Sequence, residues 1–318
     1  MEKKLENIGM PRTWLSYIGS AYGILTHAGF WAGTVPELAC ITGLAFQFIV
    51  HKNLCPSSVT VYDWDRIHWS AMDKIGVYSD HIAMFLYPGM NTGKPLLEDA
   101  HNRIRESLNA GTGVLTWAPT PILEFGIITG YNDEQKIYHV IDCTNENPDP
   151  LLFENLGRSR IPFLYIQRFL SAIDVDKQKM YQDTLLSALQ RWNTPHSNKL
   201  YAQGEKAYDN LIASLTHKTY DSFGLTYAVN VYADTKKMIA EFLRTVQKSD
   251  VFPKLDDIVT RCKKVSEHFS EMAKALPFVG PDQSHIDETK IPGIIQHAKE
   301  SQKLETEAMK QIANIIEG

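Results

Sequence analysis

Short apolar runs separated by turn residues predict a sheet in the first half of the chain. The runs span residues 114–117, 125–129 and 137–141. An apolar run bounded by Gly, Pro, Asn or Asp is typical of a buried strand, and the Gly130-Tyr131-Asn132-Asp133 turn predicts a hairpin between the last two. Glu124 precedes one of these strands and Asp142 ends the next. The sequence therefore predicts two carboxylates at the margins of this sheet.

Helical periodicity predicts the elements around the sheet. A helix is predicted over residues 13–28, because Leu15, Ile18, Tyr22 and Leu25 recur at steps of three and four residues. Further elements of the first half are predicted as a helix start at 34–37, helices over 65–75 and 96–109, and strands over 59–62 and 163–166.

Two glycines inside the first predicted helix indicate close packing. Gly19 and Gly23 lie within the 13–28 segment. Glycine costs about 1 kcal/mol relative to alanine inside a helix. We therefore expect another part of the chain to approach the helix closely at these positions.

The second half of the chain is dominated by helical periodicity. Helices are predicted over residues 177–192, 199–215, 223–246, 255–276 and 291–316. No convincing strand pattern follows the run at 163–166. The sequence thus predicts an α+β protein with two domains, residues 1–172 and an all-helical domain over residues 173–318.

Composition and charge narrow the classes of partner. The chain has 318 residues, of which 44% are hydrophobic and 22% charged, and its net charge is −5. This composition is typical of a soluble globular protein, and the absence of a Lys and Arg cluster predicts neither a nucleic-acid nor a membrane partner. No signal-peptide pattern is found at the N-terminus, so we expect a cytoplasmic protein. The pattern leaves the oligomeric state open.

Motifs for metals and cofactors are missing from the sequence. Four cysteines, Cys40, Cys55, Cys143 and Cys262, are scattered without CxxC spacing and are predicted to be free thiols. HExxH, GxSxG and GxGxxG motifs do not occur, and the Gly89 to Pro95 segment is one residue short of a phosphate loop. The sequence therefore predicts no metal and no cofactor.

Two segments carry a resemblance to a known family. Residues 16–29 resemble the nucleophile helix of papain-like proteins of the bacteriocin-leader peptidase type, in which Cys opens the helix and Gly closes it; Ser16 occupies the Cys position. Residues 124–132 resemble that group's His, five mostly apolar residues and Gly-Tyr-Asn. Glu124 occupies the His position and Asp142 the position of the acidic residue that ends the next strand.

A third segment extends the resemblance to a narrower family. Residues 42–48 and the helical C-terminal half resemble the butirosin biosynthesis protein H N-terminal-like family, whose founding member transfers an acyl group from a carrier protein to an aminoglycoside amine. The resemblance covers about residues 13–170. It implies a papain-like domain with a central helix on an antiparallel sheet, and a small-molecule or peptide substrate that can be bound to an acyl-carrier protein.

The predicted site departs from the papain pattern at both reacting positions. A papain-type site uses a thiolate that an adjacent imidazolium activates, whereas this chain offers Ser16, Glu124 and Asp142. A carboxylate serves as base for a serine when burial or a nearby like charge raises its pKa. The remaining candidates, assigned to substrate binding, are Tyr17, Gly43, Gln47 and Trp117.

The sequence supports two functions and leaves the choice open. In the first, an acyl-transfer or amide- or thioester-processing enzyme uses Ser16 as nucleophile or substrate-positioning hydroxyl, Glu124 as general base and Asp142 as orienting or pKa-raising partner. In the second, a catalytically inactive papain-like protein binds a peptide or small metabolite in the same cleft.

A displaced cysteine nucleophile is a further alternative. Cys40 or Cys143 would then be paired with His27 or His139 as its base. Both cysteines stand in apolar surroundings, where the role of a small buried hydrophobe is favoured.

Overall fold

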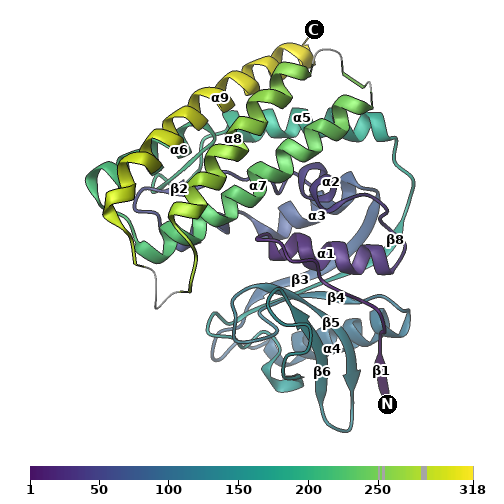
Figure 1. The fold of residues 1–318 in the computed structure, drawn as a ribbon. Coiled ribbons are helices and arrows are strands. Elements are labelled where there is room, and N and C mark those ends of the chain that lie inside the picture. The colour runs from purple at the N-terminus through teal and green to yellow at the C-terminus, as the bar shows by residue number, and fades with distance from the viewer. Residues whose placement is uncertain (250, 253–254, 281–284, 318) are drawn as a thin grey trace. The chain divides into compact units, whose positions relative to one another are not determined.

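The chain divides into two units, neither of which is continuous in sequence. The computed structural model describes residues 1–317 apart from 250, 253–254 and 281–284 (Figure 1). Unit 1 contains residues Met1–Leu38 and Asp63–Val175, and unit 2 contains Ala39–Tyr62 and Asp176–Gly318. The sequence predicts a single boundary near Ala172. In the structure the chain passes from unit 1 to unit 2 after Val175, and residues 39–62 also belong to the helical unit.

Unit 1 is built on a mainly antiparallel sheet, as the sequence predicts. Its strands are β1 (Glu2–Lys4), β3 (Val77–Phe85), β4 (Val114–Trp117), β5 (Phe125–Asn132), β6 (Ile137–Asp142), β7 (Leu151–Leu152) and β8 (Phe163–Ala172). The strand order is β3-β8-β4-β5-β6-β7, and β1 pairs with the far half of β5. Every pairing in this sheet is antiparallel.

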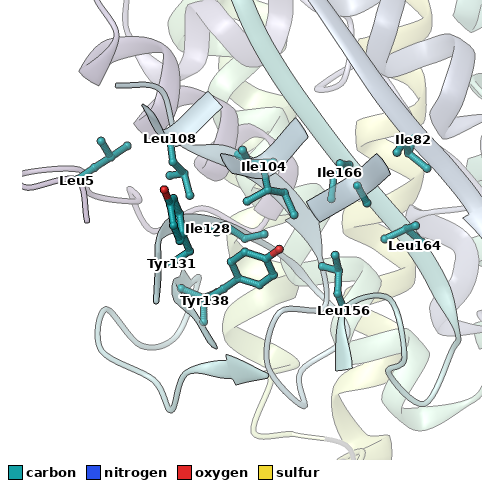
Figure 2. Packing of buried hydrophobic residues seen from close by; sticks show 13 residues of the cluster. Leu5, Ile82, Ile104, Leu108, Ile128, Tyr131, Tyr138, Leu156, Leu164 and Ile166 are labelled. Atoms are coloured by element: carbon teal, nitrogen blue, oxygen red, sulfur yellow. The ribbon is translucent and has the colours of Figure 1, made fainter. Parts of the chain in front are cut away.

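Helices cover both faces of this sheet. They are α1 (Ser16–His27), α3 (Trp64–Lys74), α4 (Gly93–Asn109) and the 3-10 turn η2 (Phe153–Asn155), while α2 (Val35–Ile41) crosses from unit 1 to unit 2. On one face, Ile104 and Leu108 of α4 pack in a buried cluster with Ile128 and Tyr138 of the sheet (Figure 2). On the other face lie α1 and α3, whose aromatic side chains pack on Phe125, the first residue of β5.

Helix α1 is packed closely at its two glycines, which confirms the expectation from the sequence. A Cβ atom on Gly23 would lie 2.0 Å from the carbonyl oxygen of Gly9, and one on Gly19 would lie 2.8 Å from that of Pro11. The helix begins at Ser16 rather than at Thr13. The Thr13 hydroxyl accepts a hydrogen bond from the Leu15 N–H at 3.2 Å, just before the first turn.

Two strands predicted for the first half of the chain differ from the structure. The strand predicted over residues 59–62 is wrong, because Val59 ends the 3-10 helix η1 (Pro56–Val59) and residues 60–62 form a turn and a bend. The strand predicted at 163–166 extends to Ala172 and pairs along its length with β3, which the sequence pattern does not predict. This pair forms one edge of the sheet.

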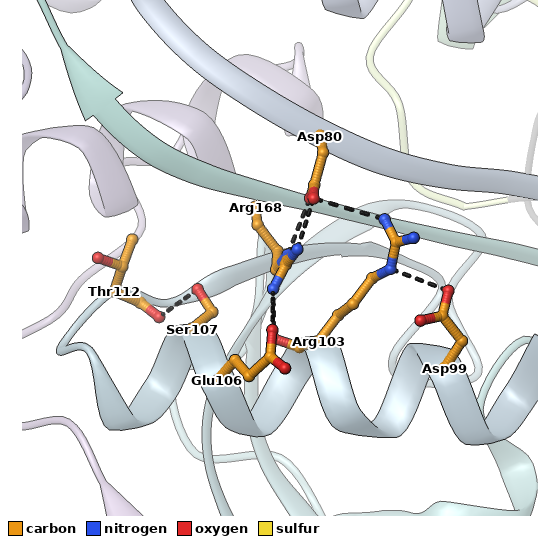
Figure 3. A network of polar contacts seen from close by, with 7 residues as sticks. All are labelled: Asp80, Asp99, Arg103, Glu106, Ser107, Thr112 and Arg168. Carbon is orange, nitrogen blue, oxygen red and sulfur yellow. Dashed lines mark hydrogen bonds and ion pairs between the residues drawn. The ribbon is translucent and has the colours of Figure 1, made fainter.

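Charged side chains fasten the β3–β8 pair to α4. Arg168 of β8 donates to Asp80 of β3 at 2.8 Å and to Glu106 of α4 at 2.8 Å. Arg103 of α4 forms ion pairs with Asp80 at 3.4 Å and with Asp99 at 2.9 Å (Figure 3). The polar residues of β3 are thus paired rather than exposed.

Unit 2 is helical, and its strands are short. Its helices are α5 (Lys177–Asn193), α6 (Glu205–His217), α7 (Ser222–Lys248), α8 (Asp256–Ala275) and α9 (Ile291–Glu317), with a 3-10 turn η4 (Glu288–Lys290). A two-stranded ladder joins β2 (Ile49–His51) to β9 (Tyr201–Gln203). Among the described residues after Ala172, β9 is the only strand, so the C-terminal half is mainly helical, as predicted. The helix predicted over residues 199–215 begins only at Glu205, because residues 201–203 pair with β2 instead. None of the helices described reaches the length and apolar character that crossing a membrane requires.

A buried ion pair lies in the interior of unit 2. Lys236 of α7 donates to both carboxylate oxygens of Glu305 of α9, at 2.7 and 2.8 Å, and each side chain is only 3% exposed. The Tyr208 hydroxyl donates to the same carboxylate at 2.5 Å, and the Lys236 ammonium lies 4.2 Å from the centre of the Phe48 ring. Residue Phe48 belongs to the 39–62 segment, which explains how that segment is held in this unit.

Candidate functional site

Ser16 and Glu124 are in direct contact in unit 1, although 108 residues separate them. The Ser16 hydroxyl donates to Glu124 Oε2 at 2.5 Å and accepts a hydrogen bond from the Phe125 N–H at 3.1 Å. Ser16 is the first residue of α1 and is 6% exposed. The start of the helix and the start of β5 therefore meet at one hydroxyl group.

Backbone pairing holds Glu124 in place. Trp117 of β4 and Phe125 of β5 are opposite one another in the ladder, and the next hydrogen bond joins the Ala118 N–H to the Glu124 carbonyl at 2.8 Å. Ala118 has a positive φ of 46°, which turns the chain away from the strand. This geometry brings the Glu124 side chain to the N-terminal end of α1, where Ser16 lies.

Asp142 lies near this pair but is engaged by its own loop. It ends β6 opposite Gly126, and its carboxylate accepts hydrogen bonds from the Thr120 hydroxyl at 2.7 Å, from the Thr144 N–H at 2.7 Å and from the Asn145 N–H at 2.8 Å. Burial raises the pKa of the Asp142 carboxyl, but these hydrogen bonds outweigh burial and lower it overall. Asp142 is thus an ionised group that orders residues 142–145. Its orienting role toward Glu124 stays a prediction.

The charges of both carboxylates affect the pKa of the nearby Cys143 thiol. Burial, followed by the charges of Glu124 and Asp142, raises the pKa of the Cys143 thiol to about 12. A nucleophilic cysteine needs the opposite shift, because the thiolate is the reactive form. The displaced-nucleophile alternative is therefore not supported at Cys143, and Cys40 is completely buried.

The raised pKa of Cys143 has a measurable consequence. We expect iodoacetamide at pH 7.5 to alkylate Cys143 in the folded protein roughly a hundredfold more slowly than an ordinary thiol, whose pKa is about 8.5, because the smaller thiolate fraction outweighs the greater nucleophilicity of a more basic thiolate. Peptide mass spectrometry after timed labelling measures this rate, and protein unfolded in urea provides the control. Rapid labelling of Cys143 in the folded protein would contradict the assignment.

The four predicted substrate-binding residues are divided between the units. Tyr17 and Trp117 belong to unit 1, whereas Gly43 and Gln47 belong to unit 2. Gly43 has a φ of +80° and lies beside Arg191, and Gln47 is buried. Ligand contact at all four positions stays a prediction.

Tyr17 belongs to a buried polar network next to Ser16. The hydroxyls of Tyr17 and Tyr165 both donate to Gln167 Oε1, at 2.8 and 3.2 Å, and Gln167 Nε2 donates to the Ser79 hydroxyl at 3.1 Å. Each of these polar groups is held in place by a hydrogen bond to another. The bond from Tyr17 to Gln167 of β8 therefore fixes the first turn of α1 to the sheet.

His68 is a member of this network that the sequence reasoning missed. Its Nδ1 lies 2.8 Å from the Tyr165 hydroxyl, and its ring stacks on Tyr17 with centroids 3.7 Å apart. Because Tyr165 donates its own proton to Gln167, Nδ1 carries the proton that it donates to Tyr165. Burial, and then the charge of His81, lowers the pKa of His68 well below its usual value, so the imidazole is neutral. The sequence feature that indicates the burial of His68 is Trp64, which lies four residues earlier and therefore on the same face of α3.

Other site classes find no support in the described part of the chain. There, no group of three or more His, Cys, Asp or Glu side chains is arranged to hold a metal ion. Comparison with family models and with curated proteins gave no match.

Proposed function

We propose that this chain is a papain-like protein, related to the butirosin biosynthesis protein H family, that transfers or hydrolyses an acyl group carried as an amide, thioester or ester. The observation that supports this proposal is the 2.5 Å hydrogen bond from the Ser16 hydroxyl to the Glu124 carboxylate. Covalent catalysis requires a nucleophile within hydrogen-bond reach of a base, and this contact provides such a pair at the start of α1. Its substrate is a small metabolite or a peptide.

The chemistry of the first half-reaction follows from the two contacts of Ser16. As the Ser16 oxygen attacks the acyl carbon, Glu124 accepts the hydroxyl proton, and the Phe125 N–H remains directed at the Ser16 oxygen. Collapse of the tetrahedral intermediate breaks the bond to the leaving group, which takes the proton from Glu124. This leaves an acyl ester on Ser16.

The second half-reaction uses the same residues. An amine or a water molecule attacks the ester carbonyl while Glu124 removes its proton. The Ser16 oxygen is then the leaving group and recovers a proton from Glu124. The transferred acyl group ends on the amine in transfer and on water in hydrolysis.

A binding protein without catalysis is the second candidate function. Ser16 is 6% exposed, and its hydroxyl both donates and accepts a hydrogen bond within the protein. Such a hydroxyl equally suits a structural link between α1 and β5. In this case the site binds a peptide or metabolite and performs no reaction.

Turnover of a substrate panel distinguishes the two candidates. The panel contains acyl thioesters of N-acetylcysteamine, matching esters and short peptides, each incubated with wild type and with Ser16→Ala. We expect wild type to release thiol, alcohol or amine from at least one class and Ser16→Ala to release none above background. Equal release by both proteins would contradict the role of Ser16.

A further inference from the structure

A buried hydrogen-bond donor lies beside the Ser16–Glu124 pair. Trp117 is 7% exposed, and its indole Nε1 is buried without a hydrogen-bond partner among the described residues. Buried donors in folded proteins are nearly always satisfied, because an unmade hydrogen bond leaves the full desolvation penalty. The indole N–H of Trp117 is therefore a group that a bound molecule would stabilise.

Ladder pairing and ring contacts place this donor next to the candidate site. Trp117 is opposite Phe125, and their ring centroids are 5.0 Å apart. The backbone N–H of that same Phe125 donates to the Ser16 oxygen, and the residue after Trp117 is hydrogen-bonded to the backbone of Glu124. The backbone of residues 124 and 125 therefore positions both Trp117, which carries the unpaired donor, and the Ser16 hydroxyl.

Aromatic rings lead from the surface to Trp117. The ring centroid of the half-buried Trp64 lies 4.8 Å from that of Trp117 and 5.7 Å from that of Phe163. The Phe163 centroid lies 4.7 Å from that of Phe85, which is 59% exposed. Trp64 and Phe163 are half-buried, whereas Trp117 and Phe125 are only 7% and 3% exposed, so these rings pack on one another from the half-exposed edge to the buried indole of Trp117.

We propose that the Trp64 ring moves aside and that the indole N–H of Trp117 then binds the carbonyl oxygen of an apolar acyl group whose body lies on the half-buried rings of Trp64 and Phe163. The proposal rests on the proposed function for the identity of the acyl group as substrate, and it adds the chemical class of that group. An apolar body suits the rings, and one acceptor oxygen suits the one unpaired donor.

The test uses two ligands that differ in the acceptor oxygen. Acetophenone and ethylbenzene have similar apolar bodies, but only acetophenone has a carbonyl oxygen, and neither can acylate a serine. The chain has six tryptophans, so protein labelled with ¹⁵N gives an indole N–H signal for each, and Trp117→Phe identifies the one from Trp117. Both ligands are titrated into the full-length wild type and into this variant.

We expect acetophenone to shift the Trp117 indole proton saturably and ethylbenzene to shift it much less. Trp117→Phe should bind acetophenone about five to ten times more weakly, the effect of one neutral hydrogen bond, while its affinity for ethylbenzene changes little. The proposal is overturned if saturating acetophenone leaves the Trp117 signal in place, if acetophenone does not bind, or if the substitution weakens both ligands equally. If the variant fails to fold, proton–proton contacts between the Trp117 indole and the Phe125 ring, whose centroids are 5.0 Å apart, assign the signal in the wild type instead. Because neither ligand reacts, a failure here is separate from a failure of acyl transfer at Ser16.

Discussion

Glu305→Gln is expected to lower the free energy of unfolding of the helical unit by about 3–5 kcal/mol, the range for removing one partner of a buried ion pair. Lys236 then keeps its ammonium in an interior where its side chain is 3% exposed and where, among the described residues, Glu305 supplies the carboxylate that it contacts. The nearby Phe48 ring offers a weaker attraction than the lost charge. Urea unfolding followed by circular dichroism of the helices measures the loss.

Two further variants separate charge burial from a general loss of packing. Lys236→Met combined with Glu305→Gln removes both charges, while the glutamine oxygen can still accept the hydrogen bond of Tyr208. This double variant should recover most of the stability, because replacing both partners removes the buried charge. Glu288→Gln is the matched control, since it breaks the exposed ion pair with Lys218 and should leave the unfolding midpoint nearly unchanged. A Glu305→Gln midpoint equal to that of Glu288→Gln would contradict this account of the core.

Glu124→Gln is expected to lower turnover of acyl substrates by about a hundredfold to ten-thousandfold, which is the range for loss of a general base. The amide keeps the shape of the carboxylate, and its oxygen can still accept the hydrogen bond of Ser16, but it cannot take up the proton. The unfolding midpoint should change little. Turnover and thermal unfolding measured on the same preparations give the comparison.

The structural role of Glu124 predicts the reverse pattern for the same substitution. If the contact only joins α1 to β5, the change should affect stability, by about 1–3 kcal/mol for a disturbed buried polar group, and leave ligand binding unaltered. Asp142→Asn is a matched control, because its carboxylate orders residues 142–145 through Thr120, Thr144 and Asn145. A larger loss of turnover in Asp142→Asn than in Glu124→Gln would contradict the assignment of Glu124 as the base.

The sequence predicts well those elements whose apolar side chains all pack into the core of a single unit. Strands β4 to β6 and helices α1 and α4 follow their patterns to within a few residues. Strand β3 escapes prediction because Ser79, Asp80 and His81 interrupt its apolar pattern. Two of these residues find their partners on β8, far along the chain, through Gln167 and Arg168.

The division into units was beyond the sequence for a related reason. Residues 39–62 carry apolar side chains that suit either core, and local periodicity does not tell which one they join. Phe48 packs against Tyr208 and Tyr232, residues more than 150 positions later. Only the folded chain shows these contacts.

The candidate site was predicted in part. The spacing of two motifs, read through the family resemblance, placed Ser16 and Glu124 together, and they are hydrogen-bonded in the structure. Asp142 was expected to serve Glu124, but its described hydrogen bonds go to its own loop and to Thr120. His68 was missed because a histidine in a polar helix resembles a surface residue until its burial is known.

Intact-protein mass spectrometry after brief mixing with a reactive acyl thioester detects an acyl group on Ser16 without any assay of turnover. We expect wild type to gain the mass of one acyl group on a peptide that contains Ser16, and Ser16→Ala to gain no such mass. Glu124→Gln should gain it far more slowly. Turnover of the thioester without any acyl group on Ser16, or the same mass gain in Ser16→Ala, would contradict the account.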